Sequence, residues 1–587
     1  MLRRWWLKTL VVIGFVAIVI GVFVVGSRPV YVGTRAGKAD ENYIDSSKCL
    51  ACHEGHYASW RRTYHSRMTQ TAETVTVQGD FTTNNTLEYL GVKARMERRP
   101  DGFFATFSYP DGRTETNKIE RTVGSRRMEQ YLIKEAGQYT RLPLAYDLVN
   151  RRWISLNGSF FHADSTDYQQ HRAQWDSNCV FCHNVKAQPN MDFGTRTFKT
   201  EVAELGIACG ACHGQTAKHI DEANSWLSRF SWWRDPSASR SVIHPEKLSA
   251  ERSLMMCGHC HGQRVPEPLD RIRQIMGPGD PYNAGDDLSA LYRPVQRDTV
   301  LGDFSFANRF WNNGSPRLTA YEYQGILRSA CYMRGKPEHK ISCLSCHSMH
   351  DGDPKGMILP VNRTNTACLE CHQKFSDGAA LAQHTGHGAA STGSSCYSCH
   401  MPRVVYGVMS FHPTHDISIP RPDLTVTRSV PNACNLCHLD RSVNWAIESS
   451  RRLWPAQFAA AQPAKDPMFN EAEGPRMLFA GDALTRAMAA EAMSGGGAVN
   501  HDPNWTGPFL LEAFNDNYPI VRYFAANGLA AINLNLAKPD YLGIDEARRA
   551  SVTLWAGIFN EAARRHSTQF AIAMRARRSD VDMDVGE

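Results

Sequence analysis

The residues best suited to chemistry are cysteines that recur in pairs, each pair followed directly by a histidine. The pattern Cys, two other residues, Cys, His occurs eight times in the 587-residue chain. The copies are Cys49/Cys52/His53, Cys179/Cys182/His183, Cys209/Cys212/His213, Cys257/Cys260/His261, Cys343/Cys346/His347, Cys368/Cys371/His372, Cys396/Cys399/His400 and Cys434/Cys437/His438. Two thiols so spaced can form thioethers with one porphyrin, whose iron the next imidazole can bind. The pattern therefore predicts eight covalently attached c-type haems, each with its motif histidine as proximal ligand.

A zinc or disulfide scaffold is the main alternative for so many cysteines. A CxxC pair is half of many zinc sites, but zinc does not require a histidine after every second cysteine. Of the 17 cysteines, only Cys331 lies outside the motifs. Cys331 could offer a thiolate to an iron or to a sulfur compound. More often, a single cysteine is a small buried apolar side chain.

Histidines outside the motifs are candidates for the second axial position of each iron. The chain has 23 histidines, so the eight motifs leave enough for every haem to have two imidazole ligands. From their placement we select His65, His171, His219, His259, His350, His387, His412 and His415 as candidate distal ligands. Each of them could instead be a surface residue or a partner of a haem propionate. Met68 is a second choice beside His65.

The N-terminal part of the chain is apolar and precedes the first motif. Residues 1–28 begin with basic residues and hold an almost wholly apolar run from 5 to 25, which is long enough to span a bilayer. We expect a transmembrane anchor, or an uncleaved signal sequence, with its positive flank in the cytoplasm. Since haem is attached outside the cytoplasmic membrane, the rest should lie on the periplasmic side of a bacterial inner membrane. Residues 29–73 then carry the first motif.

Three further segments are expected to position the remaining motifs. Residues 74–160 alternate with a period near two and contain Pro-Asp-Gly turns, which predicts a small antiparallel β module. Residues 161–440 hold motifs two to eight, and we expect short helices and loops laid over closely spaced haems. Residues 441–587 are rich in alanine and show the two-helix pattern of a HEAT-like repeat. The predicted fold class is mostly α and irregular, with haem as core.

With these motifs, the chain resembles the multihaem c-type cytochromes that carry paired CxxCH motifs. The resemblance runs from about residue 48 to 445 and is carried by "CLACHEGHYASW", "ACGACHGQTAKH", "SCLSCHSMH", "HDISIPRPDL" and "PNACNLCHLDRS". That group is related to the tetrahaem acceptor cytochromes of nitrifiers and is often fused to tetratricopeptide or HEAT repeats. The resemblance implies an extracytoplasmic location, one-electron transfer, and distal ligation by His65, His219, His350 and His415.

These features favour a membrane-anchored periplasmic octahaem cytochrome that carries electrons between respiratory partners, for example from a quinol-oxidising membrane module. The alternative is a reductase or dehydrogenase of a small nitrogen or sulfur compound, such as nitrite, hydroxylamine or tetrathionate, at one haem with an open position. A third possibility is a structural subunit of a respiratory complex. The sequence assigns no catalytic residue. Despite a formal charge of +6, it contains no basic run interleaved with aromatics, so nucleic acid is not an expected partner.

Overall fold

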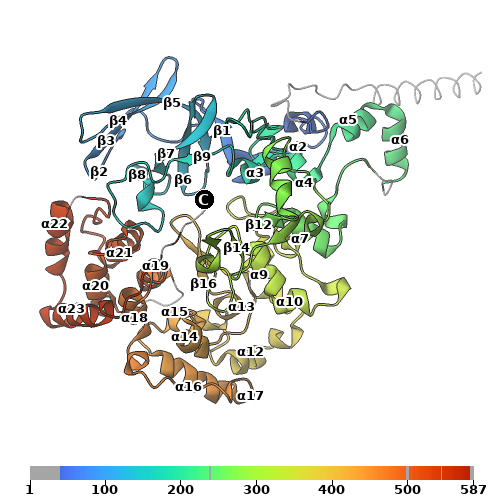
Figure 1. Cartoon of the computed structure of the whole chain (residues 1–587). Helices are drawn as coiled ribbons and strands as arrows, with labels where there is room; N and C mark the ends of the chain where they lie inside the picture. Colours follow the sequence, from blue (N-terminus) through green and yellow to red (C-terminus); the bar gives the residue numbers. More distant parts are fainter. Residues whose placement is uncertain (1–39, 237–239, 497–501, 544, 582, 584–587) are drawn as a thin grey trace, which may run out of the picture.

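The computed structural model describes residues 40–236, 240–496, 502–543, 545–581 and 583. Figure 1 shows a β-sheet from the N-terminal part, a central region of short helices, and a group of C-terminal helices. The expected membrane span at residues 5–25 lies outside the described residues. Among the described residues, no helix is long and apolar enough to cross a membrane. The predicted localisation is therefore corrected, because the structure supports no transmembrane anchor.

A nine-stranded antiparallel sheet occupies most of the chain between Thr69 and Gln174. Strands β2 to β8 pair in sequence order, while β1 pairs with β5 and β9 with β7. The strands are β1 (Thr69–Thr71), β2 (Thr86–Tyr89), β3 (Val92–Arg99), β4 (Gly102–Ser108), β5 (Thr114–Val123), β6 (Met128–Glu135), β7 (Gln138–Asp147), β8 (Arg152–Ser155) and β9 (Ala173–Gln174).

The sheet curls around an aromatic core, since β8 lies against β2. Alternate residues of β3 and β4 are buried in this core, with Met96 opposite Ala105 and Ala94 opposite Phe107. The polar residues between them face outward, as expected for a strand with one buried face. The curled sheet thus has an interior of its own.

The prediction of a small β module in a mostly α and irregular chain is wrong, because this sheet is large. The later strands are buried on both faces. On β7, Leu144 packs in the aromatic core, while its neighbour Ala145 packs in a second core shared with the C-terminal helices. Strands buried on both faces lose the two-residue period of polarity. The two-residue period of polarity is therefore clear in the outer strands and absent from the later ones.

The central region consists of short helices and two-stranded ribbons. Its helices are α2 (Glu54–Arg61), α3 (Val180–His183), α4 (Cys209–His213), α5 (Ala217–Asn224), α6 (Trp226–Arg234), α7 (Ala250–Gly258), α8 (Ile272–Met276), α9 (Glu322–Arg328), α10 (Ala330–Met333), α11 (Thr366–Leu369), α12 (Gly378–Thr385), α13 (Cys396–His400), α14 (Asp423–Arg428), α15 (Ala433–Cys437), α16 (Val443–Leu453) and α17 (Pro455–Phe458). Its ribbons are β10 (Asn184–Val185) with β11 (Glu204–Leu205), β12 (Arg264–Pro266) with β13 (Tyr292–Pro294), β14 (Val300–Leu301) with β15 (Phe304–Ser305), and β16 (Arg403–Tyr406) with β17 (Phe411–Pro413).

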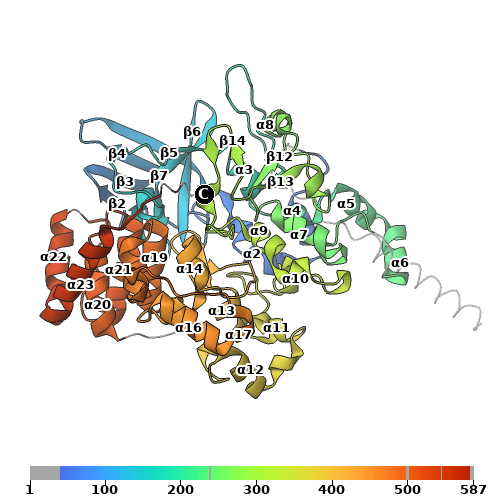
Figure 2. The same ribbon diagram turned by 60° about the horizontal axis from the view of Figure 1, so that its bottom comes forward.

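The C-terminal helices form a closed bundle that lies beside the sheet and the central region (Figures 1 and 2). They are α18 (Glu473–Ala480), α19 (Ala483–Glu491), α20 (Pro503–Ala513), α21 (Pro519–Ile532), α22 (Asp545–Ala556) and α23 (Glu561–Arg575). In an open repeat array each unit contacts only its neighbours. Here α18 packs against both α19 and α23. The first helix meets the last, so the structure does not support a HEAT-like array.

Candidate haem-binding centre

One continuous cavity of about 3120 Å³ runs through the central region, and all eight motifs line it. A pocket for a single small ligand usually measures about 300–1,000 Å³. The cavity is several times larger than such a pocket, and residues from the sheet and from α16 also contribute to its wall. Its size and lining therefore fit several large cofactors held in one space. The haem that each motif would hold is numbered 1 to 8 below, in the order of the motifs.

The motif cysteines lie on short helical turns. Helices α4 and α13 begin at the first cysteine of their motifs, and the turn brings both cysteines of each motif to one side. Residues three apart on a helix are neighbours on its surface. This local structure gives each motif the paired thiols that attachment to one porphyrin edge requires.

Six motif histidines each face a second imidazole from elsewhere in the chain. The ring-centre distances are 6.4 Å for His53–His219, 6.4 Å for His213–His350, 6.0 Å for His261–His65, 6.4 Å for His347–His415, 6.2 Å for His400–His384 and 6.1 Å for His438–His387. Imidazole nitrogens bind a metal at about 2.0 Å, which puts the ring centres of two opposed ligands roughly 6 Å apart. The residues present thus fit an iron between each pair.

Hydrogen bonds to Nδ1 orient several of these rings. Nδ1 lies 2.8 Å from the Ile243 carbonyl in His213, 2.9 Å from the Gly356 carbonyl in His347, 2.8 Å from the Ser418 carbonyl in His400 and 2.8 Å from the Thr385 carbonyl in His387. A hydrogen bond that holds Nδ1–H leaves Nε2 as the metal-binding atom. These hydrogen bonds from Nδ1 to backbone carbonyls therefore match those of iron-ligating histidines.

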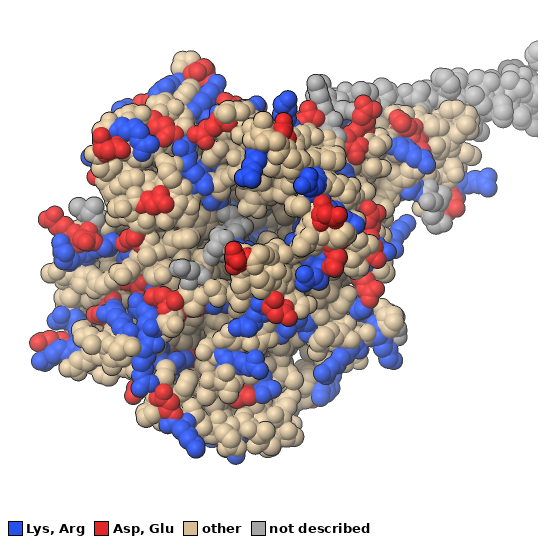
Figure 3. Space-filling model, in the orientation of Figure 1, with Lys and Arg blue, Asp and Glu red and all other residues tan. Residues whose placement is uncertain are grey.

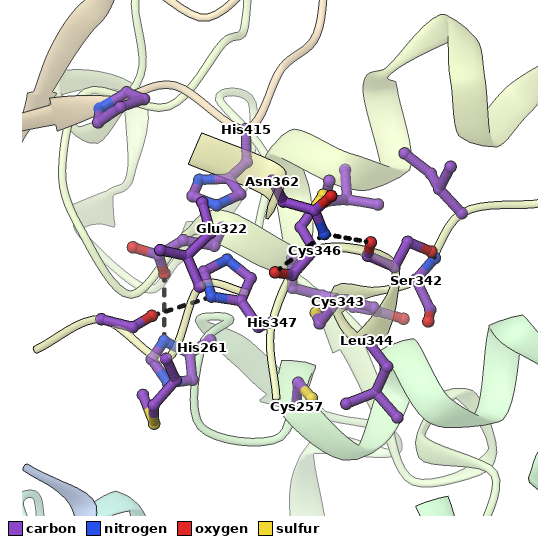
Figure 4. Close-up of a pocket in the computed structure, with 18 of the residues that line it drawn as sticks. Cys257, His261, Glu322, Ser342, Cys343, Leu344, Cys346, His347, Asn362 and His415 are labelled. Atoms are coloured by element: carbon purple, nitrogen blue, oxygen red, sulfur yellow. Dashed lines mark hydrogen bonds and ion pairs between the residues drawn. The ribbon is translucent and has the colours of Figure 1, made fainter. Parts of the chain in front are cut away.

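Figure 4 shows the centre of the cavity, where His347 and His415 face each other beside Glu322. The Glu322 carboxylate lies 3.5 Å from Nδ1 of His261. Burial lowers the pKa of His261, but the hydrogen bond and the charge of Glu322 outweigh it and raise that pKa to about 9. A carboxylate in this position makes the imidazole a more basic ligand. Glu322 thus orients the proximal histidine of haem 4 next to haem 5.

The facing histidines come from unexpected parts of the chain. His219 follows motif three but faces the histidine of motif one, and His65 follows motif one but faces the histidine of motif four. His350, His387 and His415, also among the selected candidates, face motif histidines too. His384 faces His400 but is not among the selected candidates. Its position close before motif seven was the only signal that could have identified it.

Three selected candidates do not face a motif histidine in the described part of the chain. His259 lies inside motif four, where its ring stacks on Tyr282 at 4.5 Å and its Nε2 is 2.8 Å from Asp280. His171 contacts His162 and hydrogen-bonds to Gln170. His412 lies close to Arg126 and Arg127, and burial together with these two charges lowers its pKa to about 4.

The motif histidines of haems 2 and 6, His183 and His372, also have no facing imidazole among the described residues. The extra cysteine, Cys331, lines the cavity close to Cys371 of motif six. Burial raises the pKa of the Cys331 thiol. The thiol is therefore neutral near pH 7, which does not favour the predicted alternative of a thiolate ligand.

Comparison with known proteins agrees with this geometry. The family model for the doubled CXXCH motif matches residues 336–377, and that for cytochrome c554 and c-prime matches residues 48–94. No curated protein matches the chain. A solved structure titled "Crystal Structure of Outer Cell Wall Cytochrome OcwA" has a TM-score of 0.48 and 15% identity, covering 84% of this chain and 100% of that one. With the repeated motifs, the two family matches identify the chain as a multihaem c-type cytochrome.

Proposed function

We propose that the chain binds eight haems and carries electrons between redox protein partners along a connected path. The observation that carries this proposal is the close approach of cysteines from different motifs. Cys49, Cys257 and Cys368 lie next to Cys209, Cys343 and Cys396 of other motifs, respectively. This proximity would place haem 1 beside haem 3, haem 4 beside haem 5, and haem 6 beside haem 7.

Electrostatic contacts between cysteines complete the path. Cys257 of motif four lies close enough to Cys212 of motif three to raise its pKa, and Cys346 of motif five has the same effect on Cys368 of motif six. Cys399 of motif seven neighbours Cys434 of motif eight. The order along the path is therefore haem 1, 3, 4, 5, 6, 7 and 8. Haem 2 would join at haem 4, because Cys260 of motif four lies next to Cys182 of motif two.

The paired imidazoles suit electron transfer without ligand exchange. For six haems, the two facing histidines would fill both axial positions of the iron, so that electrons would pass through the porphyrins. The protein then sets each potential through axial ligation, burial and hydrogen bonding. Lysine, arginine and acidic side chains are interspersed over the face shown in Figure 3. This mixed surface supports protein partners better than nucleic acid.

Redistribution of a single electron tests the connected path. The variant His415→Met should raise the potential of haem 5, because methionine ligation favours the reduced state. When the oxidised holoprotein receives less than one electron per chain, freeze-quenched EPR should show loss of the haem 5 signal first. The matched variant His384→Met should collect the electron at haem 7 instead. If the same haem is reduced first in both variants and in the unaltered protein, the result would contradict a connected path.

A further inference from the structure

We infer that helix α6 is a docking site for a lipid surface, into which its outward aromatic face inserts. Helices α5 and α6 form a hairpin at one edge of the molecule, away from the sheet and from the C-terminal bundle (Figures 1 and 2). Neither helix has a buried residue. With nine residues α6 is far too short to span a bilayer, which takes about 20, so it would lie along the surface.

The outward face of α6 is apolar and exposed. Its large side chains and their exposed fractions are Trp226 at 50%, Leu227 at 61%, Phe230 at 43% and Trp233 at 78%. Residues 226, 230 and 233 are four and three positions apart, which places them on one side of a helix. The rings of Phe230 and Trp233 lie 5.8 Å apart. Leaving such a cluster in water costs free energy, so this face fits a partner that is itself apolar.

The opposite face of α6 is fixed to the body of the protein. Trp232 stacks on His219, with ring centres 5.5 Å apart and planes inclined by 20°. The guanidinium of Arg240 lies over the Trp232 ring at 5.3 Å. Position 232 is two residues from position 230, which is more than half a turn around the helix. Packing on His219 therefore explains Trp232, but it does not explain the aromatic residues that point away.

The charges of the hairpin do not select a charged partner. From residue 217 to residue 240 the sequence has four basic residues, Lys218, Arg229, Arg234 and Arg240, and three acidic ones, Asp221, Glu222 and Asp235. Charges that nearly cancel give little attraction to a strongly acidic or basic surface. Tryptophan is common where proteins meet membrane interfaces, because its large apolar ring carries one polar N–H group. Insertion of rings into neutral lipid therefore suits this hairpin.

A second copy of the chain fits the outward face less well than lipid does. The four outward side chains offer roughly 500 Å² of apolar surface, given the usual areas of aromatic residues. A stable protein interface buries about 800 Å² on each partner. A bilayer needs no matching shape, since its headgroup region takes up the apolar face of a helix directly. The small size of the face thus favours lipid.

The described chain begins at the same edge. The amide of Ala217, the first residue of α5, donates to the carbonyl of Asn42 at 3.0 Å. In the sequence, residues 26–39 separate Asp40 from the apolar run of residues 5–25, and they can reach at most about 50 Å. That run is therefore tethered to the edge that carries α6, and one lipid surface can receive both.

Lipid docking through α6 would place haem 1 next to the bilayer, because Trp232 connects the helix to His219, which faces His53. Haem 1 is one end of the proposed electron path. Its orientation toward the membrane rests on the proposed function, whereas docking itself rests on the hairpin.

Hydrogen–deuterium exchange of the full-length holoprotein, with and without phosphatidylcholine vesicles, tests the inference. Mass spectrometry of peptides reads α6 separately from the rest of the chain. We expect vesicles to slow exchange at the amides of Trp226–Arg234, because inserted lipid contacts oppose the opening of this short helix. Trp233→Ser should raise the lipid concentration for half-maximal protection about tenfold, through the loss of one inserted apolar side chain.

Leu534→Ser is the matched control, since Leu534 is an apolar side chain that is 88% exposed and lies outside the hairpin. This substitution should leave the protection of α6 unchanged. Both variants change exposed side chains, so both should keep the haem content and the visible spectrum of the unaltered protein. Vesicle binding by another part of the chain does not imitate the effect at α6.

Three outcomes would overturn the inference. One is exchange at α6 that vesicles do not slow, and another is protection that Trp233→Ser leaves unaltered. The third is protection without vesicles that Trp233→Ser removes. If that protection rises with protein concentration, the face binds a second copy; if it does not, another segment of the same chain covers it. Electron redistribution in His415→Met is measured without lipid, so failure of docking leaves the proposed path standing.

Discussion

The guanidinium of Arg522 on α21 holds the carboxylate of Asp164 in a two-bond ion pair, with distances of 2.9 and 3.0 Å. The Arg522 side chain is fully buried, and Asp164 also accepts a hydrogen bond from Tyr89 of the sheet at 2.7 Å. This pair joins the C-terminal bundle to the segment between strands β8 and β9 of the sheet. The two parts are therefore bound by a buried charge pair as well as by apolar contact.

Asp164→Asn should lower the free energy of unfolding by about 3 kcal/mol, because it leaves the buried Arg522 charge without its partner. Asp540→Asn is the matched control, since Asp540 pairs with Arg152 and its side chain is 55% exposed. The Asp540→Asn substitution should lower the free energy of unfolding by about 1 kcal/mol or less. Urea unfolding followed by far-UV circular dichroism measures both values. Equal losses would show that the Arg522 pair contributes no more than a surface pair.

His219→Ala should convert haem 1 from low spin to high spin, which EPR of the oxidised protein would show. The ring of His56 is also near His53, at 6.3 Å, but it is tilted by 49°. His56 lies one turn further along the same helical segment as His53, so it cannot reach the opposite face of a porphyrin bound by His53. His56→Ala should therefore leave haem 1 low-spin. The reverse result would exchange the roles of these two histidines.

Glu129 should make the sheet less stable as pH rises. Its buried carboxylate accepts hydrogen bonds from the Gln78 and Gly79 amides and from Tyr131, yet burial raises its pKa to about 7. Between the unfolded pKa of 4.5 and this value, the folded state binds more protons than the unfolded state. Stability should fall by about 3 kcal/mol over this range and then level off. Glu129→Gln should remove this part of the pH dependence, and an unchanged profile would contradict it.

Cys331→Ser should leave the visible spectrum and the haem potentials unchanged, because burial keeps the thiol protonated. In the holoprotein Cys331 would be the one cysteine outside the thioethers, so iodoacetamide would label it alone. Labelling should be slow at pH 7. It should accelerate only above pH 9, because the ordinary pKa of a thiol is 9 and that of Cys331 is raised. A changed spin state in the serine variant would instead make Cys331 an iron ligand.

The parts of this protein that sequence could predict are those set by local chemistry. Each cysteine pair and its histidine must be close in the chain to hold one porphyrin. The attachment motifs could therefore be recognised in the sequence. The facing imidazole has no such constraint. His219 is six residues from His213, yet it faces His53. Only the three-dimensional arrangement of the motifs determines which histidine meets which.

The same limit explains why the predicted fold class was wrong. Polarity alternates clearly along β3 and β4, because one face of these strands is exposed. Leu144 and Ala145 are both buried, in cores that the sheet makes with different neighbours. Such a strand carries no periodic signal of its own.

The shared core also sets an order of maturation. Ala145 and Ile154 of the sheet pack in one core with Tyr523 and Leu542, which follow the last haem motif in the chain. The chain is synthesised from its N-terminus. The face of the sheet that carries Ala145 and Ile154 therefore stays uncovered until every CxxCH motif has been made. This face of the sheet can therefore be buried only after all eight motifs have been synthesised.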